Sequence, residues 1–335
     1  MREQYVKVND HTSYPRILQC GVPQGTVLGP LLFLIYINDL CNINTGGKVI
    51  SYADDTALIF TGKNFNEARQ NSEKGLQIIF KWLNNNLLTL NLDKTVFLTF
   101  SSYDNAVANR VNLKIHHSDC PSNDHPCNCY NINKVSSVKY LGIIVDHHLN
   151  WKEHIKFISN KLRAVSYKFY RLRPILNKAN LKLMYYAFAQ SYLLYGILGW
   201  GGVSKFNLKP LELVQKSIIK TILRRPRTYP SIKVFAEFKV CSVRNLFLKM
   251  LMLHTFKFKI FSFSLYDTRL SSSSYIKIPT MLTSLGQRQG SYLGPKIFNL
   301  LPSNLSRLDN YKDFKKQLCI WIHSLSHNHW NTFFN

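Results

Sequence analysis

The sequence predicts an α+β protein, in which a strand-rich first half is followed by a helical second half. Apolar residues make up 46% of the 335 residues and charged residues 18%, which is enough apolar material to form a core and excludes global disorder. Short β-rich segments separated by Gly, Pro, Asn and Asp occupy residues 1–150. Apolar residues at helical spacing dominate from residue 151 onward.

The first elements are hairpins and a short helix. Residues 4–8 and 17–20 are β-rich and flank a polar turn, which predicts a hairpin over residues 4–21. An apolar run at 31–40 follows Pro30, a residue that suits the first position of a helix. Residues 49–51 and 57–61 predict a second hairpin, whose tip carries two acidic residues.

A long helix and two further strands complete the first half. Asn64 and Glu67 have the spacing of a capping box, and the apolar residues after them recur at helical intervals. Residues 96–101 and 135–146 read as strands.

The second half is predicted to be helical and basic. Apolar residues step by three and four from Ile155 to Leu172, which predicts one buried helix stripe. Lys156, Lys161 and Lys168 fall on the remaining faces of that helix. Residues 180–195 and 211–223 predict two further helices.

The charge of the chain is uneven. Lys and Arg number 43 against 18 Asp and Glu, a net charge of +25. Residues 1–150 hold 13 basic and 12 acidic side chains, whereas residues 151–335 hold 30 and 6. A half this basic indicates a polyanionic partner, most simply nucleic acid or an anionic membrane face.

Membrane insertion and an oxidising compartment are the less favoured interpretations. The most apolar runs, 28–40 and 187–200, are shorter than the roughly 20 residues of a spanning helix. Seven cysteines, an odd number, in a chain without a secretory leader favour an intracellular, reducing compartment with mostly free thiols.

The adjacent carboxylates Asp54 and Asp55 are the strongest chemical signal. Two neighbouring carboxylates at a hairpin tip repel each other unless they face solvent or bind a cation. One interpretation is a solvated turn. The other is a site for hard divalent ions such as Mg²⁺, which take carboxylate oxygens together with substrate phosphates.

The motifs around this pair carry a resemblance to a known family. GVPQGTVLGPLLF at 21–33 lies ahead of YADD at 52–55, and LNLDKT at 90–95 and VKYLG at 138–142 follow. In this order and spacing they resemble the palm of the reverse transcriptases of LINE-like non-LTR retrotransposons. LNWKEHI at 149–155, the pairs Tyr195-Gly196 and Trp200-Gly201, and GPKIFNLLP at 294–302 are similar to later parts of those enzymes.

The resemblance implies an RNA-directed DNA polymerase that uses an RNA template, a DNA primer and dNTPs, with two Mg²⁺ ions and no membrane. Its implied fold is a polymerase palm, an antiparallel sheet over residues 17–146 with helices on one face. An α-helical thumb and a mostly helical carboxyl-terminal region follow the palm. The implied domains are 1–150 (partial palm), 151–227 (thumb) and 228–335 (a basic region of unknown role).

The resemblance also assigns roles to individual residues. Asp54 and Asp55 would bind the metal ions and Lys94 would assist the leaving pyrophosphate, although a lone lysine after a helix is commonly just solvated. Gln24, Gly25 and Tyr52 would lie at the nucleotide or template, with a buried strand tyrosine as the alternative for Tyr52. The primer grip would be Tyr140, Leu141 and Gly142, and the contacts to the nucleic-acid backbone would be Lys156, Lys161 and Lys168.

One part of the family pattern is not found. A two-metal site takes carboxylates from two strands, and the only aspartate ahead of Gln24 is Asp10, in a polar turn. We therefore expect a truncated copy that lacks the first catalytic aspartate and the fingers. The alternatives are a non-catalytic nucleic-acid-binding remnant of such an enzyme and a non-functional, aggregating fragment.

The Cys/His-rich loop at 116–130 is the remaining candidate site. Cys120, Cys127 and Cys129 could hold zinc together with nearby histidines, but their spacing fits no common zinc module. The other interpretation is an insertion between two strands of the palm.

Overall fold

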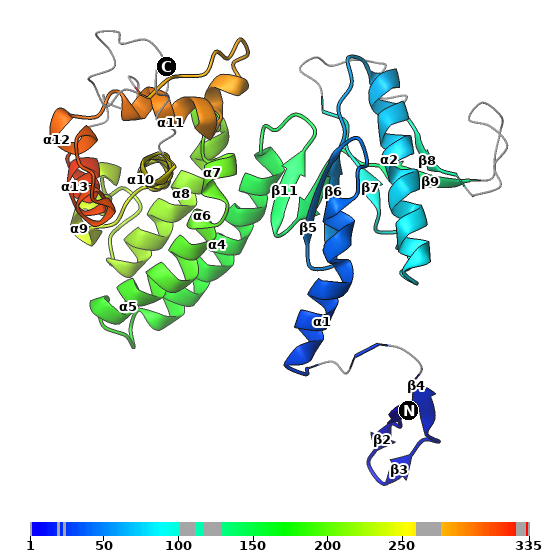
Figure 1. The fold of residues 1–335 in the computed structure, drawn as a ribbon. Coiled ribbons are helices and arrows are strands. Elements are labelled where there is room, and N and C mark those ends of the chain that lie inside the picture. The colour runs from blue at the N-terminus through cyan, green and yellow to red at the C-terminus, as the bar shows by residue number, and fades with distance from the viewer. Residues whose placement is uncertain are drawn as a thin grey trace. The chain divides into compact units, whose positions relative to one another are not determined.

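The computed structural model describes residues 2–18, 21–22, 25–100, 111–116, 129–258, 276–325 and 333 of the chain. These residues form two compact units, Met1–Leu141 and Gly142–Asn335 (Figure 1). Unit 1 contains small sheets and two long helices, and unit 2 is helical after its first strand. The mixture of helices and small sheets agrees with the predicted α+β class.

Unit 1 begins with the predicted hairpin. In its outer pair Arg2 lies opposite Leu18, and in its inner pair Lys7 lies opposite Thr12. The strands of unit 1 are β1 (Arg2–Gln4), β2 (Lys7–Val8), β3 (His11–Thr12), β4 (Arg16–Leu18), β5 (Lys48–Tyr52), β6 (Asp55–Ile59), β7 (Val96–Phe97), β8 (Leu113–Ile115), β9 (Tyr130–Lys134) and β10 (Ser137–Tyr140).

Two helices lie between these strands. Helix α1 (Leu28–Ile37) begins two residues before Pro30, where the Thr26 hydroxyl accepts the Gly29 N–H, and continues as the 3-10 helix η1 (Asn38–Asn42). Helix α2 (Phe65–Asn85) starts at the predicted capping box, because Asn64 accepts the Glu67 N–H at 2.8 Å and Glu67 accepts the Lys63 N–H at 2.7 Å. The Asn64 side chain satisfies one of the helix's free N–H groups, and the Glu67 side chain satisfies the N–H of Lys63, the residue before the cap.

In the described chain, the strands between residues 17 and 146 lie in several small sheets and not in the single antiparallel sheet that was predicted, and the three-stranded sheet β7-β9-β8 is mixed. Strand β8 pairs antiparallel with β9, but β7 pairs parallel with β9. Parallel neighbours need a long connection, and residues 98–129 supply one that includes β8 itself. Helix α2 lies beside these strands in Figure 1, and its Leu76 and Phe80 pack on the core of Leu113, Ile115 and Ile132.

Strands β10 and β11 (Ile143–Asp146) form a two-stranded hairpin around the turn Leu141-Gly142. Leu141 has a φ of 46° and Gly142 a φ of 80°. Positive φ at both central residues is the pattern of the type I′ hairpin turn. Glycine adopts it freely, whereas a leucine there costs about 1 kcal/mol.

Unit 2 continues from β11 into helices. They are α4 (Lys152–Leu172), α5 (Lys178–Met184), the π-helical η2 (Tyr185–Gln190), α6 (Ser191–Leu194), α7 (Ile197–Trp200), α8 (Lys205–Ile222), α9 (Ser231–Phe238), α10 (Val243–Lys257), the 3-10 helix η3 (Gly286–Arg288), α11 (Gly290–Phe298), α12 (Ser303–Ser306) and α13 (Tyr311–Ser324). The predicted helix over 180–195 therefore contains a π-helical segment in its middle.

One core unites the helices of unit 2. The predicted stripe of α4 is confirmed, because Ile155, Ile158, Leu162 and Phe169 are all buried. Helix α10 buries residues on every side and lies among α8, α11 and α13 in Figure 1. Residues 228–335 share this core with residues 151–227. None of the helices in the described parts of the chain is long and apolar enough to span a membrane.

The loop from β11 to α4 is organised by Asp146. Its buried carboxylate accepts the N–H groups of His148 at 3.2 Å, Asn150 at 3.0 Å and Trp151 at 2.7 Å. Trp151 has a φ of 61° immediately before the helix. A carboxylate at this position also stabilises the positive end of the α4 dipole.

His154 ties the first turn of α4 back to β11. Its Nδ1 accepts the N–H of Ile144 at 3.2 Å, and its Nε2 is buried without a hydrogen-bond partner among the described residues. The ring lies edge-on to Trp151 and Trp200. Burial lowers the pKa of His154 to about 4, so the ring is neutral at pH 7.

Gln215 joins three parts of the same unit. This fully buried amide donates to the Tyr185 hydroxyl at 2.8 Å and to the Cys241 carbonyl at 2.9 Å, and it accepts the Val243 N–H at 3.0 Å. Each polar group in this cluster therefore has a partner, which a buried polar group requires. The amide links α8 to the π-helical segment and to the start of α10.

Candidate functional site

The acidic tip predicted from the sequence is the turn of the β5–β6 hairpin. Tyr52 pairs with Asp55 across the two strands, so that Ala53 and Asp54 form the turn. Asp54 and Asp55 are both exposed, and Tyr52 is 67% exposed. The alternative of a buried strand tyrosine at Tyr52 is therefore wrong.

The turn is strained at Ala53, which has a φ of 53°. A left-handed backbone costs a non-glycine residue about 1 kcal/mol. Strain of this kind persists where the surroundings impose it, and it is common at functional sites. At Ala53 it accompanies a turn that displays two carboxylates to solvent.

Tyr140 is the predicted site residue that the structure brings to the acidic tip. Its hydroxyl oxygen is buried and has no hydrogen-bond partner in the parts of the chain that the structure describes. Burial raises the pKa of Tyr140, and the negative charge of Asp55 raises it further. The first residue of the predicted primer grip is thus within electrostatic range of the second aspartate.

Lys94, Gly25 and Gln24 are the next residues that were predicted to lie at this site. Lys94 is exposed in the turn before β7, where its N–H bonds to the Asn91 side chain at 3.1 Å. Within the described chain no hydrogen bond or ion pair joins Lys94 to Asp54 or Asp55. Gly25 is exposed with a φ of 82° three residues before α1, and Gln24 lies outside the described residues.

The tip offers some of the donors that Mg²⁺ prefers. Carboxylate oxygens are hard ligands, and both aspartates are free of protein ion pairs in the described chain. The described residues contain no cluster of three or more His, Cys, Asp or Glu side chains that could hold a metal ion. Asp54 and Asp55 therefore supply two carboxylates of the kind that Mg²⁺ prefers, and the described residues add no third acidic ligand beside them.

The Cys/His loop is described only at its ends. Cys120 and Cys127 lie outside the described residues, and Cys129 is a buried free thiol. The zinc interpretation therefore stays a prediction.

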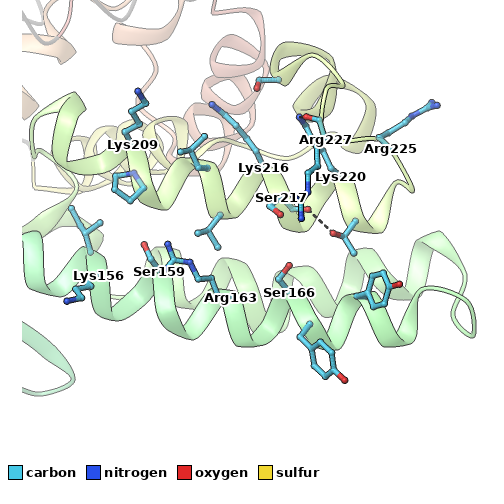
Figure 2. Close-up of a pocket in the computed structure, with 18 of the residues that line it drawn as sticks. Lys156, Ser159, Arg163, Ser166, Lys209, Lys216, Ser217, Lys220, Arg225 and Arg227 are labelled. Atoms are coloured by element: carbon cyan, nitrogen blue, oxygen red, sulfur yellow. Dashed lines mark hydrogen bonds between the residues drawn. The ribbon is translucent and has the colours of Figure 1, made fainter.

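A basic groove lies between α4 and α8 in unit 2 (Figure 2). It has a volume of about 1250 Å³ and no acidic residue in its described lining. Its basic residues are Lys152, Lys156, Arg163 and Arg173 on or next to α4, Lys209, Lys216 and Lys220 on α8, and Arg225 and Arg227 after α8.

Of the three predicted backbone contacts, Lys156 alone lines the groove. Lys161 and Lys168 are exposed on α4 but lie outside the lining. The basic residues of α8 were not predicted as site residues, because they become groove residues only when α8 packs against α4. Their signal was Lys216 and Lys220 on the helix predicted over 211–223, with Lys209 just before it.

Comparisons with known proteins agree with the motifs. Residues 1–145 match the family model described as reverse transcriptase (RNA-dependent DNA polymerase). Residues 1–145 are therefore similar to reverse transcriptases. The matched segment contains the β5–β6 tip, Lys94 and the turn at Leu141-Gly142.

The relatives are named as polymerases of mobile elements. The chain is 28% identical over 239 residues to the probable RNA-directed DNA polymerase from transposon BS of Drosophila melanogaster, covering 67% of this chain and 24% of that protein. It is 27% identical over 235 residues to the RNA-directed DNA polymerase from mobile element jockey of the same species, covering 67% and 24%.

A third relative is the Pol polyprotein from the type-1 retrotransposable element R1 2 of Nasonia vitripennis, 26% identical over 149 residues, which are 42% of this chain and 33% of that protein. The chain spans about a quarter of the length of the first two relatives. Since their matches exceed 145 residues, the likeness to these relatives extends beyond the segment matched by the family model into the helical unit. No solved structure matches the chain.

Proposed function

We propose that this chain takes part in RNA-directed DNA synthesis, the template-directed transfer of a nucleotide from a dNTP to a DNA primer on an RNA template. The observation that carries the proposal is the exposed pair Asp54 and Asp55 at the tip of a strained hairpin, inside the segment that is similar to reverse transcriptases. The names of the relatives support the same reaction.

The carboxylates of Asp54 and Asp55 would hold Mg²⁺ in this reaction. Bound Mg²⁺ supplies charge stabilisation at the attacking and leaving oxygens of the phosphoryl group. The exposure of both aspartates supports this role, since a hydrated ion and a nucleotide need access to the tip.

The remaining roles follow the motifs. Tyr52, exposed beside the aspartates, would contact the nucleotide together with Gln24 and Gly25. Lys94 would neutralise or protonate the leaving pyrophosphate, which an ammonium group can do. Tyr140, Leu141 and Gly142 would hold the primer end. The position of the Tyr140 hydroxyl near Asp55 supports this role.

The backbone contacts are assigned to the basic unit. Lys156, Lys161 and Lys168 would bind phosphates, and all three are exposed on α4. The four cysteines seen in the described chain are free thiols, which supports a reducing, intracellular site of action.

A chimera tests the proposal. The segment of this chain that aligns with the jockey polymerase over 235 residues replaces the matching segment of that polymerase, and primer extension is measured on an RNA template with Mg²⁺. The chimera should incorporate dNTPs, and Asp54→Ala should abolish incorporation. Asp10→Ala, which alters an exposed carboxylate outside the tip, is the matched control and should retain activity. A chimera that folds, as measured by circular dichroism, but stays active without Asp54 would refute the proposal.

The chain by itself is expected to be inactive. Two neighbouring carboxylates supply one side of a two-metal site, and the described residues offer no third acidic ligand beside them. Purified chain should therefore extend no primer with Mg²⁺ or Mn²⁺. Extension that disappears in Asp54→Ala would contradict this expectation.

A second candidate function is nucleic-acid binding without catalysis. The basic groove between α4 and α8 favours it, because its described lining holds nine Lys and Arg residues and no acidic residue.

A further inference from the structure

We propose that Tyr195 is a positioning residue for primer extension, which holds the turn Leu141-Gly142 in the conformation that would grip the primer end. The inference rests on the proposed function, because it takes this turn as the primer grip. Gly142 is the first residue of unit 2, so the contacts that carry the inference, from Gly142 onward, all lie within that unit.

The ring of Tyr195 lies against the open side of Gly142. Gly142 has a φ of 80°, and a β-carbon built on it would lie 3.4 Å from Cε1 and 3.8 Å from Oη of Tyr195. Both distances are within van der Waals range. Glycine has no side chain of its own to anchor the turn, so the Tyr195 ring limits its movement on this side.

The residue after Tyr195 receives the next residue of the hairpin. Gly196 has a φ of 61°, and a β-carbon built on it would overlap Cδ1 of Ile143. The side chain of Ile143 therefore occupies the space beside Gly196. Glycine permits both this close approach and the left-handed backbone. Tyr195 and Gly196 thus contact Gly142 and Ile143 in succession.

A buried framework fixes the backbone of Tyr195. The side chain of Trp200 is fully buried, and its Nε1–H donates to the Tyr195 carbonyl at 2.9 Å. The ring of His154 lies edge-on to Trp200 and accepts the Ile144 N–H at 3.2 Å. Residues 142, 143 and 144 are therefore each held by residues from the helical part of unit 2.

Tyr195 contributes little to the core of the helices. It is 56% exposed, whereas Leu193 and Ile197 on either side of it are buried. Removing its ring should leave the stability of unit 2 almost unchanged, as surface substitutions usually do. We expect a mobile turn instead, which places the primer end less precisely. A reacting group misplaced by about 1 Å can slow a reaction about a hundredfold, so the chemical step should suffer more than binding.

The first test measures hydrogen–deuterium exchange of the full chain by mass spectrometry. Tyr195→Ala should speed exchange of the amides of residues 142–144 about tenfold, because the ring no longer limits local opening of the turn. Tyr195→Phe keeps the ring and should stay within about threefold of the parent chain. Tyr192→Ala is the matched control, since Tyr192 is 40% exposed one turn earlier on α6. It should leave this exchange unchanged, and Tm should stay within about 2 °C in all three variants.

The second test measures single-nucleotide primer extension by the chimera with the jockey polymerase. A continuous segment that covers 67% of this chain necessarily includes residues 142–200. Tyr195→Ala should lower kcat about tenfold and leave the affinity for primer–template within about twofold, because a misplaced primer end slows the chemical step. Tyr195→Phe should restore most of the rate, and Tyr192→Ala should change neither quantity.

Four results would overturn the inference. Unchanged exchange at residues 142–144 in Tyr195→Ala would mean that the ring does not hold the turn. Faster exchange in Tyr192→Ala as well, or a lower Tm, would mean that the substitutions loosen the whole unit. In an active chimera, an unchanged kcat in Tyr195→Ala would separate the turn from catalysis. A loss of primer–template affinity as large as the loss of kcat would make Tyr195 a binding residue.

The two tests also separate this inference from the proposed function. Exchange in the full chain needs no catalysis, so it decides whether Tyr195 holds the turn even when the chimera extends no primer. An inactive chimera with slow exchange at residues 142–144 that Tyr195→Ala accelerates would count against the proposed function and not against the contact.

Discussion

Replacing Asp146 with alanine should destabilise the helical unit by about 3–5 kcal/mol. The carboxylate accepts three backbone N–H groups, from His148, Asn150 and Trp151, in a buried position. A hydrogen bond to a charged acceptor contributes about 1.5–3 kcal/mol, and a buried donor left without a partner costs about 1–3 kcal/mol. The free energies lost with the three hydrogen bonds are not additive, because the bonds share one loop and water reaches part of the opened site.

The measurement is urea and thermal unfolding, followed by circular dichroism at 222 nm. For a unit of this size each kcal/mol shifts Tm by about 2–4 °C, so Asp146→Ala should lower Tm by about 10 °C. Asp146→Asn keeps one acceptor oxygen and should lose about half as much. The control is Asp309→Ala, which alters an exposed aspartate of the same unit. If Asp146→Ala lowers the unfolding free energy by less than about 1 kcal/mol, the conclusion that this carboxylate organises the loop from β11 to α4 is refuted.

The other predictions concern single buried or strained groups. Because the pKa of His154 falls to about 4 on folding, the unfolded state takes up a proton first as pH drops below about 6.5. Unfolding free energy should therefore decline by up to about 3 kcal/mol between pH 6.5 and 4 in urea titrations, and a His154→Asn variant should lack that slope. Leu141→Gly should raise the unfolding free energy by up to about 1 kcal/mol in urea unfolding, because Leu141 has a φ of 46° that glycine adopts without strain. A lower unfolding free energy would contradict the inferred backbone strain at Leu141. Tyr140→Phe should leave stability unchanged or raise it by about 1 kcal/mol in the same assay, because it removes a hydroxyl with no partner in the described chain. Gln215→Leu should lower the unfolding free energy by about 3 kcal/mol, because Tyr185 and two backbone groups lose their hydrogen bonds. A Tm within about 2 °C of that of the parent protein would contradict this prediction.

The local elements were determined by the sequence. The acidic hairpin follows from β-rich segments on both sides of Tyr52–Asp55, and the start of α2 follows from Asn64 and Glu67. The buried face of α4 follows from apolar residues at steps of three and four. These features depend on neighbours within a few residues, so patterns in the chain are sufficient to predict them. The likeness to reverse transcriptases also followed from short motifs, because their order along the chain is itself sequence information.

The tertiary structure alone decided what lies beside what. The parallel pairing of β7 with β9 joins segments separated by more than thirty residues, and nothing in either strand encodes its direction. Lys209 and Lys216 became groove residues only through the packing of α8 on α4, which buries Leu211 and Ile218. Helical periodicity predicts which face of each helix is buried but not which helix covers it. The groove therefore follows from an apolar contact that periodicity cannot assign, while its positive charge was already present in the sequence.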